Sequence, residues 1–163
     1  MSIASSNLKL VHDAAWSTLL NLQKMPDHPR HRNGGYLTLM RDWGLIEAVL
    51  LVGKCDLASA QKYYELSLEK ASRLFLNEAH RSSHESRNEK NQMYRGAVRA
   101  RNSSLILSFS GCTENEDEVI SLMSAIELES MDVAEAREIA AISDNALFVR
   151  YLAEYGHEHD IEE

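Results

Sequence analysis

The sequence predicts an all-α protein of six to seven helices, arranged as a compact helical bundle or a short solenoid-like array. Two prolines and seven glycines among 163 residues leave few interruptions, which favours long helices over many short strands. No segment rich in Val, Ile and Thr alternates apolar and polar residues with a period of two, the pattern typical of a half-buried strand. Several segments instead repeat apolar residues at steps of three and four, which is the helical period.

The length favours one helical domain covering residues 1–156, because a chain of this size buries about 70% of its unfolded surface around one core. The hydrophobic fraction of 44% and the charged fraction of 26% are ordinary for a globular domain. Residues 157–163 are predicted to form an acidic, flexible tail.

The first predicted helix follows a cap at Ser5–Ser6 and ends near Lys24, because a residue that precedes a proline, here Pro26, is displaced from the α region. Both prolines and two adjacent glycines fall within residues 26–35, which predicts a loop. One face of this helix carries Leu8, Val11, Ala15, Leu19 and Leu22.

A second helix is predicted over Tyr36–Val52, and its apolar residues on most sides indicate a central position. Asp56 is the predicted cap of a third helix, in which Glu69 and Arg73 have the spacing of a helical ion pair. The predicted apolar stripe of the third helix is Leu57, Ala60, Tyr64, Leu68, Ala71 and Phe75.

Polar residues 80–91 predict a turn, and a fourth helix is predicted over Gln92–Phe109. At 100° per residue, Arg101 falls inside the apolar arc of that helix. An unpaired buried charge is costly. Arg101 is therefore predicted to be at least half buried and to form a structural ion pair with a carboxylate from residues 114–144.

Thr113 and Glu116 have the spacing of a capping box at the start of a fifth helix. Asp132 and Glu135 repeat that spacing for a short sixth helix. The last helix, residues 146–155, is predicted to follow a cap at position 143 or 144 and to end before a glycine.

Residues 56–65, Asp-Leu-Ala-Ser-Ala-Gln-Lys-Tyr-Tyr-Glu, resemble the start of the second helix of a tetratricopeptide repeat. Ala60 and Tyr64 stand at its small and aromatic packing positions, and Ala48 and Leu51 fit its first helix. The resemblance covers one unit, about residues 41–74, and a tandem array needs about three or more units. It implies a single helical hairpin of the kind found in protein-binding scaffolds.

Basic and acidic residues are unevenly distributed along the chain. Residues 1–101 hold fifteen Lys and Arg residues and ten acidic ones, whereas residues 102–163 hold two basic and fifteen acidic residues. A dense carboxylate surface accelerates binding of a basic protein. We therefore hypothesise a non-catalytic protein-interaction module, similar in profile to inhibitors, immunity proteins or chaperones, that binds a basic partner through its acidic C-terminal half. The predicted contact residues are Glu114, Glu116, Asp117, Glu118, Glu127, Glu129, Phe148, Tyr151 and Tyr155.

The last helix is apolar on nearly all sides, and two interpretations stay open. It is either a central core helix or a helix with one face in the core and the other in a homodimer interface, where Tyr and Phe are favoured.

Two other function classes are alternatives. A nucleic-acid-associated regulator would use the loop 26–35 and the basic segment 81–101, although a net charge of −8 opposes binding of a polyanion, so we do not expect nucleic acid. An all-α enzyme would need a polar site assembled across helices. The sequence contains no Gly-x-Ser-x-Gly elbow and no phosphate-binding glycine loop, which argues against an enzyme and gives no catalytic residue.

Neither a metal nor a cofactor is expected. His80 and His84 have the four-residue spacing of two helical metal ligands, but Arg81 beside them disfavours a cation. Cys55 and Cys112 follow no metal or redox spacing and are predicted to be free thiols. With no apolar run near the ~18 residues of a membrane span and no signal-peptide pattern, the expected location is cytoplasmic.

Overall fold

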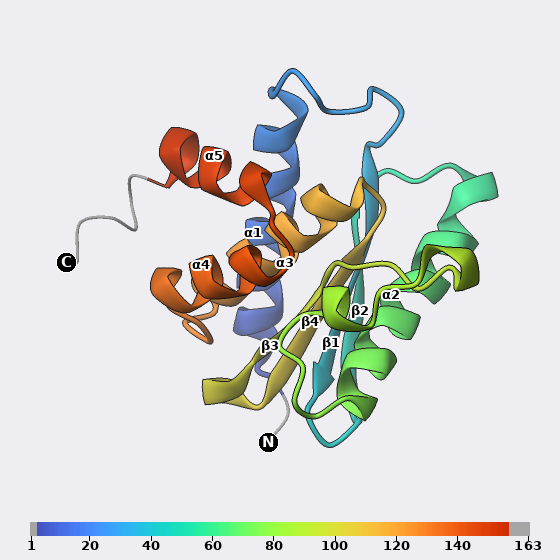
Figure 1. The fold of residues 1–163 in the computed structure, drawn as a ribbon. Helices are drawn as coiled ribbons and strands as arrows, with labels where there is room; N and C mark the ends of the chain where they lie inside the picture. Colours follow the sequence, from blue (N-terminus) through green and yellow to red (C-terminus); the bar gives the residue numbers. More distant parts are fainter. Residues whose placement is uncertain (1–2, 157–163) are drawn as a thin grey trace.

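Four antiparallel strands form the centre of the molecule, and helices cover both faces of the sheet (Figure 1). The computed structural model describes residues 3–156, so the predicted tail at 157–163 lies outside the described residues. The strand order is β2-β1-β4-β3, with β1 and β4 in the middle. The strands are β1 (Gly34–Arg41), β2 (Ile46–Gly53), β3 (Ala97–Ala100) and β4 (Leu105–Ser110).

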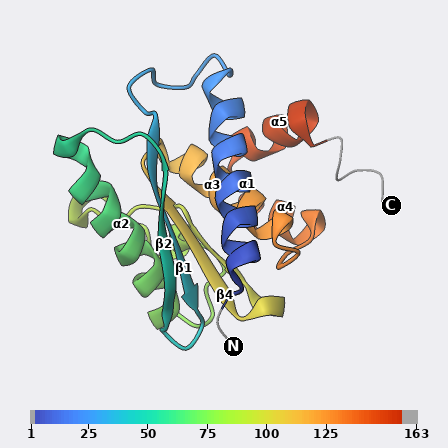
Figure 2. The same ribbon diagram turned by 180° about the vertical axis from the view of Figure 1, so that it is seen from behind.

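The helices form two layers, one on each side of the sheet, and the two layers contain different numbers of helices (Figures 1 and 2). Helices α1 (Ser5–Gln23) and α3 (Glu114–Glu127) lie against one face, with α4 (Val133–Ile142) and α5 (Ala146–Tyr155) packed beside α3. Helix α2 (Leu57–Leu76) covers the other face and is the only α-helix on that side within residues 3–156. Short 3-10 turns occupy Ser83–Ser86, Glu89–Asn91 and Arg101–Ser103.

The all-α prediction is therefore wrong: the chain has an α/β fold. The predicted helix Tyr36–Val52 is the β1–β2 hairpin, closed by a turn in which Gly44 has a φ of 93°. Helices on both sides bury a central strand such as β1 on both faces, so its sequence is apolar without alternation and resembles a buried helix. The first helix implied by the tetratricopeptide resemblance likewise coincides with strand β2.

The predicted helix Gln92–Phe109 is also wrong, because this segment contains β3, a 3-10 turn and β4. Ser104 ends the turn in the left-handed region, with a φ of 51°, and β4 then runs between β1 and β3 with all six residues buried. Arg101 lies in the turn and is exposed. Its guanidinium donates to the Ala79 carbonyl at 3.3 Å and pairs with no carboxylate of residues 114–144, so the predicted structural ion pair is wrong.

Capping signals in the sequence did identify real helix starts. The Asp56 side chain accepts from Ser59 N, and the capping box of Thr113 and Glu116 forms at the start of α3. Asp132 caps α4. Helix α5 is capped by Asn145 rather than by the predicted residue 143 or 144.

Helix α2 exists as predicted, but its buried face differs from the predicted stripe. Leu57 is 97% exposed, although the stripe begins with it. The predicted ion pair between Glu69 and Arg73 forms at 2.9 Å. The buried residues of the helix are Ser67, Lys70, Ala71, Arg73 and Leu74, so two cations lie on its buried side.

Within residues 3–156, no helix is both long enough and apolar enough to span a bilayer.

Two strand ends approach each other closely enough to require glycine. A Cβ added at Gly35 would lie 2.0 Å from the Ser110 carbonyl oxygen, at the end of β4. We expect Gly35→Ala to lower the free energy of unfolding by about 1–3 kcal/mol, because the β1–β4 pair must separate to admit the methyl group. Urea denaturation measures this loss. The neighbouring change Asn33→Ala adds no Cβ and should cost under about 0.5 kcal/mol; equal losses in the two variants would contradict the argument.

Candidate functional site

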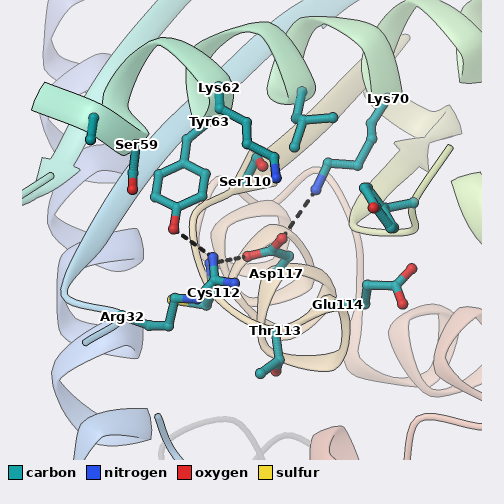
Figure 3. A pocket seen from close by; sticks show the side chains of 13 residues that line it. Arg32, Ser59, Lys62, Tyr63, Lys70, Ser110, Cys112, Thr113, Glu114 and Asp117 are labelled. Atoms are coloured by element: carbon teal, nitrogen blue, oxygen red, sulfur yellow. Dashed lines mark hydrogen bonds and ion pairs between the residues drawn. The ribbon is translucent and has the colours of Figure 1, made fainter. Parts of the chain in front are cut away.

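A cavity of about 370 Å³ lies between α2 and the turn that connects β4 to α3 (Figure 3). Its side chains come from four separated segments of the chain. Helix α2 and the β4–α3 turn form opposite walls, a residue of the α1–β1 loop lies at one side, and Tyr94 lies at another. The residues that line the cavity include Arg32, Ser59, Lys62, Tyr63, Lys70, Tyr94, Cys112, Thr113, Glu114 and Asp117.

A buried ion pair forms the floor of this cavity. Lys70 is 1% exposed, and its Nζ donates to Asp117 Oδ2 at 3.1 Å. The same ammonium group donates to the Phe109 carbonyl at 2.6 Å and the Arg95 carbonyl at 3.2 Å. All three donors of the ammonium group therefore have an acceptor, as a buried cation requires.

Asp117 fixes the turn as well as the lysine. Its Oδ1 accepts from the Cys112 backbone N–H at 2.8 Å. Burial raises the pKa of Asp117 to about 6, against the opposing effects of the Lys70 charge and the Cys112 N–H. Burial, together with the Asp117 and Glu116 carboxylates, also raises the pKa of the Cys112 thiol well above its usual range. Cys112 is thus held as a thiol, which is a poor nucleophile.

The rim of the cavity is formed by Arg32, at the end of the α1–β1 loop. Its Nη1 donates to the Tyr63 hydroxyl at 2.6 Å, and its guanidinium lies 5.4 Å from the centre of the Tyr63 ring. His28 fixes the loop: Nε2 contacts the Arg32 carbonyl at 2.7 Å, and Nδ1 contacts the Glu116 carboxylate.

The charges that line the cavity are not all balanced within the chain. Lys70 is paired with Asp117, and Glu114 accepts two bonds of 2.8 Å from Arg87. Arg32 and Lys62 pair with no carboxylate among residues 3–156. The cavity is therefore lined by two cations, Arg32 and Lys62, that no carboxylate of residues 3–156 neutralises.

Buried arginines hold the irregular segment that carries Tyr94. Arg73 donates to the Ser83 carbonyl and the Ser86 hydroxyl, each at 2.7 Å, and to the Tyr94 carbonyl. Arg99 donates to the His80 carbonyl at 3.0 Å. The wall of the cavity is thus attached to α2 and β3 by hydrogen bonds from cations to backbone carbonyls.

Three predicted contact residues on α3 are buried and bonded within the chain. Glu116 contacts His28, and Asp117 pairs with Lys70. Glu118 is 0% exposed and accepts from Ser82 Oγ at 3.1 Å, from Asn145 Nδ2 at 3.0 Å and from the Ser143 hydroxyl. Burial raises the pKa of Glu118. These carboxylates organise the interior rather than an outer surface.

The other predicted contact residues are spread between interior and surface. Phe148 and Tyr151 are buried in the core, and Tyr155 is half-buried with its ring 5.1 Å from that of Tyr151. Glu127 is half-buried, and Glu129 is exposed after the end of α3. Glu114 lines the cavity, so the structure brings only part of the predicted set together.

His80 and His84 do not gather further metal ligands. In the described part of the chain, no three His, Cys, Asp or Glu side chains are grouped as a metal site would need.

Sequence reasoning missed Arg32, Lys62, Tyr63 and Lys70 as site residues. A signal for Lys70 was present, because it stands beside Ala71 and one turn before Leu74 on the buried side of α2. A lysine in such an apolar helical pattern must find acceptors. Lys62 and Arg32 have no comparable signal, since exposed basic residues are ordinary.

The chain matches none of the protein-family models, curated proteins or solved structures with which it was compared.

Replacing Lys70 alone should lower the free energy of unfolding far more than replacing both Lys70 and Asp117. Lys70→Met leaves the Asp117 carboxylate buried without its cation, and we expect the free energy of unfolding to fall by about 3–5 kcal/mol. Adding Asp117→Asn removes the orphaned charge while retaining an acceptor for Cys112 N–H, and should restore at least about half of that loss. Urea denaturation of both variants measures these values. A double variant no more stable than Lys70→Met would refute the assignment of the loss to an unpaired charge.

The raised pKa of Asp117 predicts a specific pH dependence. Its ordinary value is 3.8, so between about pH 4 and 6 the folded state holds a proton that the unfolded state has lost. This contribution to stability is present below pH 4 and is lost as the pH rises through 6. The stability of the wild type minus that of Asp117→Asn should therefore fall by on the order of 2 kcal/mol from pH 4 to pH 7. Urea denaturation at each pH measures the difference, and a difference that is constant with pH would contradict it.

Proposed function

We propose that this protein is a small-molecule-binding domain whose ligand occupies the cavity between α2 and the β4–α3 turn. The observation that carries the proposal is the combination of a cavity of about 370 Å³ with fixed polar groups around it. Ligand sites in proteins are typically concave, about 300–1,000 Å³ in volume, and contain a few placed polar groups that orient the ligand. The cavity is at the small end of that range and fits a metabolite-sized ligand.

The rigidity of the walls supports a binding role. The floor is fixed by the Lys70–Asp117 pair, and the rim by the contacts of His28 and Arg32. A site held in its binding geometry before the ligand arrives avoids the cost of ordering these side chains on binding. The raised pKa of the Cys112 thiol disfavours nucleophilic chemistry, so we propose binding without a covalent step.

Binding of a basic protein through the acidic half stays a prediction, and the geometry supports it less well. Three of its proposed contact carboxylates, Glu116, Asp117 and Glu118, are buried. Phe148 and Tyr151 are also buried and are unavailable to a partner or a second copy without rearrangement.

Nucleic-acid binding through residues 81–101 is supported less well still. Arg81 pairs with Glu138 at 2.9 Å, Arg87 pairs with Glu114, and Arg99 is buried. Phosphate contacts require exposed cations that are not already paired.

We also propose a cytoplasmic location, because Cys55 and Cys112 are free thiols and a reducing compartment preserves that state.

Ligand binding in the cavity is tested by NMR fragment screening with a blocking variant. Ala58 is exposed in the first turn of α2 and lines the cavity, so Ala58→Trp should fill the entrance with little effect on folding. We expect fragments at millimolar concentration to shift the backbone amides of Ser59, Tyr63 and Thr113 in the wild type, and Ala58→Trp to weaken this binding at least about tenfold.

Leu57→Trp is the matched control, because Leu57 is 97% exposed and does not line the cavity. Fragments should bind this variant as they bind the wild type. Absence of any fragment binding at these amides, or equal binding to both tryptophan variants, would exclude the cavity as a ligand site.

A further inference from the structure

We infer that the ligand of this cavity is a small organic acid whose carboxylate is bound by Arg32 and Lys62; the inference rests on the proposed function and specifies its chemistry.

The charge balance favours an anion. Of the five charged groups that line the cavity, Lys70 and Asp117 neutralise each other, and Glu114 is neutralised by Arg87. The two that remain, Arg32 and Lys62, are both cations and have no carboxylate partner among residues 3–156. A bound anion would complete the pairing that the chain itself leaves open.

The hydrogen bonds of Arg32 favour a carboxylate in particular. Both of its bonds use Nη1, to the Tyr63 hydroxyl at 2.6 Å and to the Gly111 carbonyl at 3.5 Å. Nε and Nη2 make no hydrogen bond to any described residue. These two groups form one edge of the planar guanidinium, and that edge matches the two oxygens of a carboxylate in a bidentate pair.

Arg32 is also held in place before any ligand binds. Its backbone carbonyl contacts His28 Nε2 at 2.7 Å, and His28 is in turn bound to Glu116 at the start of α3. Its guanidinium lies over the Tyr63 ring. His28 is therefore a positioning residue for the rim, whereas Arg32 itself would touch the ligand.

The other lining residues indicate what the remainder of the ligand, beyond its carboxylate, should look like. Ala58, Leu66, Tyr63 and Tyr94 supply apolar and aromatic surface, while Ser59 and Thr113 supply hydroxyl groups. Lys62 and Lys70 both reach from α2 toward the β4–α3 turn, with Arg32 below Tyr63 (Figure 3). A compact, partly apolar acid fits this lining better than an extended polyanion.

The test compares acids with neutral analogues of the same shape. Benzoate, phenylacetate and hexanoate, each paired with its primary amide, and phenyl phosphate are titrated into the full-length protein and followed by the amides of Ser59, Tyr63 and Thr113. We expect the acids to bind at least about tenfold more tightly than their amides. Arg32→Gln should abolish this preference, and Arg32→Lys should recover only part of it because the bidentate edge is lost.

Arg30→Gln is the matched control for charge, because Arg30 is exposed in the same loop, does not line the cavity and removes the same unit charge. It should change acid binding by less than about twofold. Lys62→Gln should weaken the acids and leave the amides unchanged. Folding of every variant is checked by its amide spectrum.

The outcomes separate the two proposals. Amides that bind as well as acids, or an acid preference that survives Arg32→Gln, would overturn the carboxylate assignment and leave a ligand site in place. Phenyl phosphate that binds more tightly than every acid would overturn it in favour of phosphate. Absence of binding by acids, amides and phosphate alike would count against both the carboxylate and the cavity as a ligand site.

Discussion

The ammonium group of Lys70 connects four parts of the chain that are distant in sequence. It extends from α2 and donates to the last buried strand β4, to the segment before β3, and to Asp117 in the first turns of α3. Removing this cation from water is costly, and the cost is offset only where every donor finds an acceptor in good geometry. Two backbone carbonyls and one carboxylate provide that geometry, which fixes the position of α2 relative to the β4–α3 turn. The cavity exists between these two elements, so its shape depends on this group.

Other buried cations on the α2 side of the sheet also donate to backbone carbonyls. Arg73 and Arg99 are buried and donate mainly to carbonyls of residues 74–94, a segment with few regular backbone hydrogen bonds of its own. A connection without ladder partners needs other donors for its buried carbonyls. The guanidinium groups supply them, so the irregular wall of the cavity is attached to α2 and β3 by side-chain hydrogen bonds. On the opposite side, Glu118 has the complementary role, because its carboxylate accepts from Ser82 and from the α4–α5 junction.

These contacts show where part of the acid content after residue 101 lies. The acidic excess after residue 101 suggested an outward-facing carboxylate surface, yet three consecutive acids, Glu116, Asp117 and Glu118, point into the protein. One helical turn that begins at a capping box brings its acids toward different partners: a histidine, a lysine and a set of hydroxyl and amide groups. Charge order in the sequence carries no information about these partners, which come from other parts of the chain. It is the interior, rather than the surface, that accounts for much of the acid content of α3.

The sequence was informative where structure is local and uninformative where it is not. Capping residues Asp56 and Thr113 identified α2 and α3, because a cap depends only on neighbours three residues away. The strands β1 and β4 were missed because a strand covered on both faces loses the alternation that distinguishes it from a helix, and only its partners across the sheet reveal it. The cavity could not be predicted for the same reason, because Arg32, Lys70 and Asp117 come to line it only after β1 and β4 pair. Gly35 directly precedes the first β1–β4 pair, Tyr36 with Ser110. Its lack of a side chain lets the end of β4 approach β1, and the turn that follows β4 borders the floor of the cavity. The chemistry of the site is therefore set by the order of the strands, which no single segment of the chain specifies.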